Sequence, residues 1–168
     1  MYITGKFIKL TDSTNQSYYG IDISHQDIEY FITHLRLQGV DEEFISKKLN
    51  RDNGHYHITV ANTMASNKFK NDIKFQNLIS QLIDRDIVIE TLGIGHVEVN
   101  DRGTDKQAWF VVCKNSELTQ SFVDIGILQD LHVTIAFNPT DVFRVRKNED
   151  TIIYPIVDIV KKKKLTKM

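Results

Sequence analysis

The sequence is poor in cysteine and proline, with one cysteine and two prolines. The lone Cys113 excludes an internal disulfide and a zinc site built from several cysteines. No apolar run approaches the ~20 residues of a membrane helix. Lys6 and Lys9 interrupt the apolar residues of the N-terminus, so we expect no signal peptide, no membrane association and a cytoplasmic setting. No glycine-rich loop follows a predicted strand, which leaves Rossmann and P-loop nucleotide sites unsupported.

The composition is that of a globular protein, because 41% of its 168 residues are hydrophobic and 26% are charged. No linker rich in glycine and serine divides the chain, so we expect one domain over residues 1–160. A basic tail follows over residues 161–168. Without its five lysines the chain has 16 basic and 22 acidic residues, although the net charge of the whole is −1. Such a tail either is a solvated terminus with no further role or attracts the phosphates of a nucleic acid.

Hydrophobic periodicity predicts a mixed α+β fold with an antiparallel sheet. The predicted strands are 1–10, 56–60, 87–99, 106–113, 131–137 and 151–160. The predicted helices are 24–36, 41–49, 68–83 and 116–123, and residues 11–19 are expected to form a loop. The sheet should be antiparallel because the strands at 87–99 and 106–113 are joined as a hairpin.

Two segments of the chain repeat each other. His57-Ile-Thr59-Val-Ala and His132-Val-Thr134-Ile-Ala have the same pattern of residue types, 75 positions apart. The sequence has only six histidines, 13 threonines and four alanines. Counting matches to the pattern, chance produces this pair in far fewer than about one in a thousand arrangements. The repeat therefore indicates a shared structural or chemical role.

Strand geometry predicts what the repeat presents. Side chains alternate between the faces of a strand, so His57 and Thr59 share one face with the following alanine, which leaves room above the sheet. His132 and Thr134 do the same in the second copy, and the opposite face of each strand is apolar. One neutral and one protonated histidine suit general base and acid catalysis near pH 7. The threonine hydroxyls can donate to phosphate oxygens. This chemistry needs no metal or other cofactor.

Because of these motifs and the order of its predicted elements, the sequence resembles the 2H phosphoesterase superfamily, whose members include RNA 2′,3′-cyclic phosphodiesterases. The resemblance implies a bilobal fold, in which two antiparallel sheets with helices outside face a central groove. It assigns acid and base catalysis to His57 and His132, in an order left open, and phosphate binding to Thr59 and Thr134. The substrate it implies is a nucleotide or an RNA.

Residues outside the motifs are weaker candidates. The candidate substrate contacts are His55, Trp109, Phe110 and Tyr2, followed by Tyr18 and Tyr19. One of Trp109 and Phe110 is expected in the core, since neighbours on a strand face opposite sides. Arg144 and Arg146 are either phosphate contacts or solvated surface. His96 and Glu98 are too few ligands for a metal site.

The sequence thus predicts a metal-independent phosphodiesterase that opens or forms a 2′,3′-cyclic phosphate. Two alternatives stay open. One is a phage-type nuclease that degrades cyclic oligonucleotide immune signals, and the other is an inactive module that binds nucleotides or RNA ends. The sequence predicts no particular protein partner.

Overall fold

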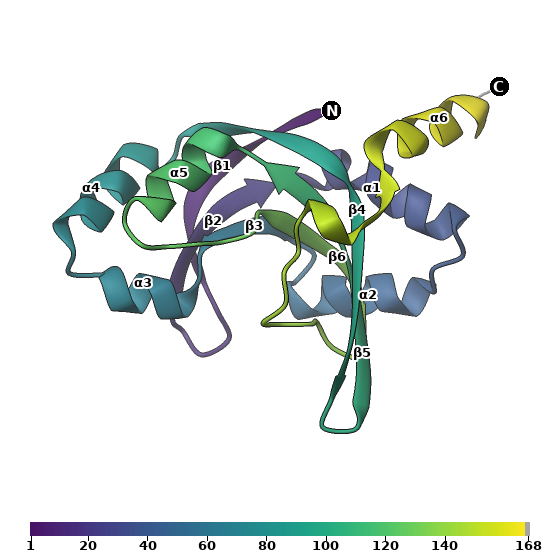
Figure 1. Ribbon diagram of the computed structural model, residues 1–168, viewed down its shortest axis with the longest axis horizontal. Coiled ribbons are helices and arrows are strands. Elements are labelled where there is room, and N and C mark those ends of the chain that lie inside the picture. The colour runs from purple at the N-terminus through teal and green to yellow at the C-terminus, as the bar shows by residue number, and fades with distance from the viewer. Residues whose placement is uncertain (167–168) are drawn as a thin grey trace.

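A computed structural model describes residues 1–166 of the chain, with side chains described for residues 1–161. This part of the chain forms an α+β fold of seven strands and six α-helices (Figure 1). The strands are β1 (Tyr2–Thr11), β2 (Ser17–Ile23), β3 (Tyr56–Ala61), β4 (Asp86–Asp101), β5 (Thr104–Lys114), β6 (His132–Asn138) and β7 (Ile152–Pro155). The helices are α1 (His25–Leu37), α2 (Glu42–Arg51), α3 (Thr63–Phe69), α4 (Ile73–Leu82), α5 (Ser116–Val123) and α6 (Ile156–Thr166). None of the described helices is both long and apolar enough to span a membrane.

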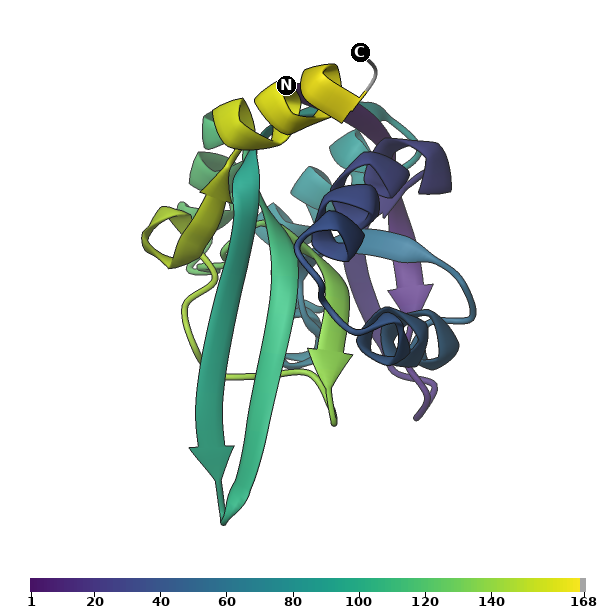
Figure 2. The same ribbon diagram turned by 90° about the vertical axis from the view of Figure 1, so that its right-hand side faces the viewer.

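All seven strands belong to one antiparallel sheet, whereas two sheets were expected. Its order is β3-β2-β1-β4-β5-β6, and β7 pairs with β4. The 16-residue β4 joins the two halves, because it pairs with β1 over residues 86–90 and with β5 over residues 90–101. The sheet is so strongly curved that β3 and β6, the two ends of this order, come into contact (Figure 1). The long β4–β5 hairpin extends beyond the rest of the molecule (Figure 2).

The first predicted helix is confirmed as α1, and its sequence explains both ends. The Ser24 hydroxyl caps the helix by accepting from the Asp27 amide. Its buried side chains recur at helical spacing and fill the main core: Ile28, Phe31, Ile32 and Leu35. The chain leaves the helix at Gly39, whose φ of +80° is a conformation that glycine adopts at little cost. The short second helix is confirmed as α2, capped by Asp41.

Two predictions for the N-terminal half are wrong in detail. Residues 11–19 are not all loop, because β1 and β2 pair as a hairpin up to Thr11 and Ser17. The Asp12 carboxylate closes the turn by accepting from the amides of Thr14 and Gln16. The single helix expected at 68–83 is two helices, because Asp72 caps a new one at α4. In both places an aspartate redirects the backbone within a polar stretch.

The C-terminal strand expected at 151–160 is also wrong. Its strand part is only β7, and α6 begins directly after Pro155, which has no N–H with which to continue a ladder. Ile156 and Ile159 pack on the main core at the spacing of three that a helix provides. The backbone of α6 continues into the lysine run as far as Thr166. The expected role of the basic tail at 161–168 concerns side chains that, after Lys161, lie outside the described residues.

Candidate active site

The two His-x-Thr motifs lie on β3 and β6, the strands that meet where the curved sheet closes on itself. His57 and Thr59 are half-buried on β3, whereas Ile58 and Val60 between and beyond them are buried in the core. His132 on β6 is likewise half-buried beside the buried Val133. The prediction that each histidine lies on the face away from the apolar core side chains is confirmed.

The repeat in sequence is also a repeat in backbone geometry. Val60 has no partner in β2, and Ile135 has no partner in β5, because each is the extra residue of a β-bulge. Val60 and Ile135 hold the same place in the two motifs, directly after the threonine. Bulges of this kind are designed features that redirect side chains near functional sites. The two motifs therefore present their histidine and threonine on equivalent stretches of backbone.

The bulges change the position predicted for the two alanines. Ala61 pairs with Tyr19, and Ala136 pairs with Trp109, and both alanines are completely buried. Directly opposed residues share a face and contact each other, so each alanine accommodates a large aromatic neighbour. The expectation that the alanines leave open room above the sheet is therefore wrong, because the extra residue turns them into the core.

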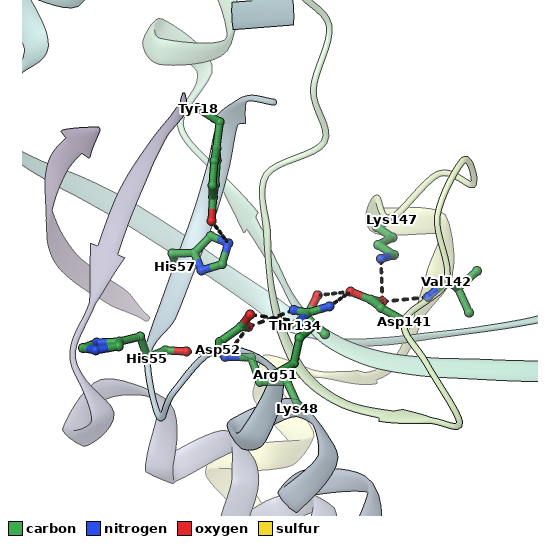
Figure 3. A network of polar contacts seen from close by, with 10 residues as sticks. All are labelled: Tyr18, Lys48, Arg51, Asp52, His55, His57, Thr134, Asp141, Val142 and Lys147. Atoms are coloured by element: carbon green, nitrogen blue, oxygen red, sulfur yellow. Dashed lines mark hydrogen bonds and ion pairs between the residues drawn. The ribbon is translucent and has the colours of Figure 1, made fainter. Parts of the chain in front are cut away.

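A network of charged side chains connects Thr134 of the second motif to the segment that precedes the first motif (Figure 3). Its centre is Asp141, which follows β6 and is only 5% exposed. The Asp141 carboxylate accepts from the Arg51 guanidinium at 2.7 Å and from the Lys147 ammonium at 3.1 Å. The Thr134 hydroxyl donates to the same carboxylate at 3.4 Å. Arg51 is the last residue of α2, so the network links the second motif to the segment that precedes the first.

The other half of the network lies next to β3. Asp52 pairs with Arg51 at 2.9 Å and with Lys48 at 3.1 Å. Lys48 also donates to the backbone carbonyl of His55, and burial lowers its pKa to about 8. Together with Asp141 and Lys147, the network contains three basic and two acidic side chains. This excess of positive charge favours a bound anion.

His57 is surrounded by groups of both signs. Burial lowers its pKa to about 4, although the nearby Asp52 carboxylate acts in the opposite direction. The Tyr18 hydroxyl lies 3.5 Å from the Nε2 atom of His57, and the two rings meet edge to face. The ring is therefore neutral at pH 7 in the free protein, with a carboxylate near enough to help it accept a proton.

His132 has a fixed orientation. Its Nδ1 atom lies 2.9 Å from the carbonyl oxygen of Asp130, which can only accept, so Nδ1 carries the proton and Nε2 has a free lone pair when the ring is neutral. Burial lowers the pKa of His132 to about 4, and the Lys147 ammonium acts in the same direction. The Asp130 carboxylate is held by Arg146 at 2.8 Å and by the Lys147 amide at 3.0 Å. Arg146 thus helps to fix Asp130, whose carbonyl orients His132.

The aromatic candidates divide between the two sides of β5. Phe110 lies beside His132, with ring centroids 5.6 Å apart, and is completely buried. Trp109 faces the other side, where it stacks on Phe44 of α2 and is 8% exposed. One of the two is on the histidine side, as expected, but neither exposes a ring face for a base. Tyr19 is partly buried and packs against Phe7 and Phe75 at the edge of the core.

The other two candidate contacts do not join the site. His55 lies directly before β3, and its ring points away from His57 and Thr134 (Figure 3). Tyr2 is 69% exposed on β1 and makes no hydrogen bond or ring contact with either motif within the described residues. The structure therefore groups the motif residues with Tyr18 and Phe110, but not with His55 or Tyr2.

The charged network was missed by sequence reasoning. Asp141 and Lys147 lie in a loop, and Arg51 and Asp52 lie where α2 ends, so no periodic pattern marks them. The sequence offered one signal for this network, namely a carboxylate, Asp141, a few residues beyond the second motif.

Two other features lie away from the motifs. A cavity of about 550 Å³ lies between the β1–β2 hairpin and helices α3 and α4, and no motif residue lines it. Its lining includes Lys9, Tyr19 and Lys70. His96 contacts Gln107 at 3.1 Å and Glu98 at 3.7 Å. No three histidine, cysteine, aspartate or glutamate side chains in the described part of the chain are grouped to hold a metal ion.

Comparison of the chain with protein-family models, with curated proteins and with solved structures gives no match.

Proposed function

We propose that the protein is a metal-independent phosphodiesterase that acts on nucleotide phosphodiesters, opening or forming a 2′,3′-cyclic phosphate. The observation that carries the proposal is the pair of His-x-Thr motifs with the same bulge, on two strands that contact each other. The charged network between them supports a site for an anion. We further propose that the parts of the sheet on either side of β4 correspond to the two lobes of 2H phosphoesterases, and that the protein acts in the cytoplasm.

We assign the general base of ring opening to His132. Its Nε2 lone pair is free because Nδ1 donates to the Asp130 carbonyl, and the Lys147 ammonium favours the neutral ring. Nε2 takes a proton from water as the water oxygen bonds to phosphorus. The bond from phosphorus to one ribose oxygen then breaks. In ring formation the two roles reverse: His57 takes the proton of the attacking ribose hydroxyl, and a protonated His132 donates its proton to the leaving oxygen.

We assign the general acid to His57, which donates a proton to the departing ribose oxygen. In the free protein its pKa of about 4 leaves it neutral, so His57 must take up a proton from solvent when the substrate binds. A bound phosphate raises the pKa of a neighbouring imidazole because it stabilises the charged form, and Asp52 acts in the same direction. The acid is thus formed when the anionic substrate binds.

The phosphate oxygens require donors from both motifs. Thr59 supplies a half-buried hydroxyl from β3. The Thr134 hydroxyl donates to Asp141 in the free protein, so it has to turn towards the substrate. Arg51, whose side chain is 34% exposed, is the network cation most accessible to a bound phosphate. These donors stabilise charge that shifts onto the non-bridging oxygens in the transition state.

The proposal is tested with a panel of 2′,3′-cyclic mononucleotides, RNA ends with a cyclic phosphate and cyclic oligonucleotides, with products identified by mass spectrometry. Ring opening of the first two classes, lost in His57→Ala and His132→Ala, is the expected result. Turnover confined to cyclic oligonucleotides would support the nuclease alternative. Binding without turnover of any member would support the inactive module and overturn the proposal.

A further inference from the structure

The cavity between the β1–β2 hairpin and helices α3 and α4 is separate from the candidate active site. Its volume of about 550 Å³ is within the range of small-molecule sites, and no residue of either motif lines it. Tyr19 lines the cavity, whereas its neighbour Tyr18 contacts His57. Because neighbouring side chains on a strand point to opposite faces, the cavity and His57 lie on opposite sides of β2. The cavity is therefore not an extension of the proposed phosphodiester site.

The residues that line the cavity supply positive charge and no negative charge. Lys9 of β1 and Lys70, directly after α3, both line it, and none of its lining residues in the described part of the chain is acidic. Four other lysines of the described chain form ion pairs, but Lys9 and Lys70 do not. The chain without the five lysines of residues 161–168 has 16 basic and 22 acidic residues, so this lining runs against the overall charge. Two ammonium groups beside one cavity favour a ligand with more than one negative charge.

The rest of the lining combines hydroxyl groups with an apolar wall. Ser17 of β2 and Thr63 of α3 supply hydroxyls, which can donate to phosphate oxygens as an ammonium can. The apolar wall consists of Tyr19, Phe75 and Ile79. An organic group that covers this wall removes apolar surface from water, which favours binding. The lining therefore suits a phosphate that is attached to an organic group better than a free phosphate ion.

The walls of the cavity are held together by contacts between their elements. The Ser66 hydroxyl of α3 donates to a backbone carbonyl of β3 at 3.0 Å, and Ser66 is only 6% exposed. The Gln76 side chain of α4 donates to the carbonyl oxygen of Lys70 at 2.8 Å, which joins the two helices. The rings of Phe75 and Tyr19 meet edge to face with centroids 5.9 Å apart, which packs α4 against β2. A cavity with walls that are already fixed binds a ligand with little loss of conformational entropy.

We propose that this cavity is a second binding site, and that its ligand is a small phosphate monoester with an apolar organic group. Lys9 and Lys70 neutralise the phosphate, because a phosphate monoester carries a charge of about −1.5 to −2 at pH 7. The organic group packs on the wall that Tyr19 and Phe75 form. The site does not depend on the proposed reaction, since it shares no residue with the motifs or with the charged network.

The test is a titration of the full chain with phenyl phosphate, benzoate and inorganic phosphate, followed by the backbone amide signals in NMR spectra. Phenyl phosphate should shift the amides of the lining residues and bind most tightly, because benzoate carries one charge and inorganic phosphate has no apolar group. Lys9→Gln and Lys70→Gln should each weaken its binding about 5-fold, the effect of losing one exposed charge contact. Lys6→Gln and Lys74→Gln are the matched controls and should keep the wild-type affinity, because these exposed lysines of β1 and α4 do not line the cavity.

The outcomes separate this inference from the proposed function. The inference is wrong if the lining amides do not shift, if Lys9→Gln and Lys70→Gln both bind phenyl phosphate like the wild type, or if benzoate or inorganic phosphate binds as tightly. Shifts confined to the surroundings of His57 and His132 would likewise overturn it. Turnover of the nucleotide panel judges the proposed function separately. Turnover without binding in the cavity would leave only the proposed function standing, and binding in the cavity without turnover would leave only the second site.

Discussion

Arg51 donates a 2.7 Å hydrogen bond to Asp141, which lies 90 positions further along the chain. Through this bond the end of α2, just before the first motif, is joined to the loop just after the second. Lys147 completes the arrangement from the far side of the carboxylate. The two halves of the candidate site are thus connected by charge as well as by the sheet.

Asp141→Asn should strongly destabilise the fold. The substitution leaves Lys147, whose side chain is 6% exposed, without its carboxylate. Removing one partner of a buried ion pair costs about 3–5 kcal/mol, because the other charge stays buried and unpaired. Urea unfolding measures the effect. The control is Glu42→Gln, which breaks the exposed pair with Arg36 and should cost less than about 1 kcal/mol. Equal losses for the two variants would contradict the structural role of Asp141.

His57→Ala and His132→Ala should each reduce turnover by about 10² or more, the usual effect of losing a general acid or base. The double variant should lose much less than the product of the two effects, because the residues act as a unit. Steady-state rates on a cyclic nucleotide measure this. His55→Ala is the matched control, since its ring points away from the site, and it should keep the wild-type rate. A near-normal rate in either motif variant would rule out the paired mechanism.

Activity should persist after treatment with EDTA. The proposed acid, base and phosphate donors are all side chains of the chain itself, and the motif histidines are accompanied by threonines instead of carboxylate or thiolate ligands. The measurement is the rate before and after dialysis against the chelator, with a metal-dependent phosphodiesterase as a positive control. Loss of activity that one added divalent metal restores would show that the mechanism is wrong.

Stability should fall as the pH is lowered from about 6.5 to about 4. Burial holds the pKa values of His57 and His132 at about 4, below the ordinary value of 6.5. In that window the unfolded chain binds more protons than the folded one, so the free energy of unfolding rises with pH. Each histidine contributes a slope of at most about 1.4 kcal/mol per pH unit.

Urea titrations at several pH values measure this slope. His132→Gln, which cannot be protonated, should make the slope shallower between pH 4.5 and 6.5. The matched control is His55→Gln, which replaces an exposed histidine outside the two motifs. A wild-type slope in His132→Gln would mean that His132 is not held neutral by the fold.

Predictions from the sequence succeeded where a pattern is local. The alternation of side chains along a strand correctly predicted that His57 and His132 lie on the face opposite the core. The capping residue Ser24 correctly predicted the start of α1. They failed where position depends on distant contacts. The bulge at Val60 breaks the alternation on which the placement of Ala61 depended. The sequence around Asp141 would predict an exposed side chain in a loop. Asp141 is buried instead because it pairs with Arg51 and Lys147, which come from other parts of the chain.

The repeated bulge also bears on regiochemistry. The two motifs have the same bulge after their threonine. If the proposed function is correct, a phosphorus atom bound between them would face the same residue types from both sides, and the motifs alone would not distinguish the 2′-oxygen from the 3′-oxygen as leaving group. That choice falls to neighbours that the two sides do not share: Tyr18 beside His57, and Lys147 with Phe110 beside His132. The ratio of 2′- to 3′-phosphate products should therefore shift in variants of these neighbours, whereas the motif residues determine the rate.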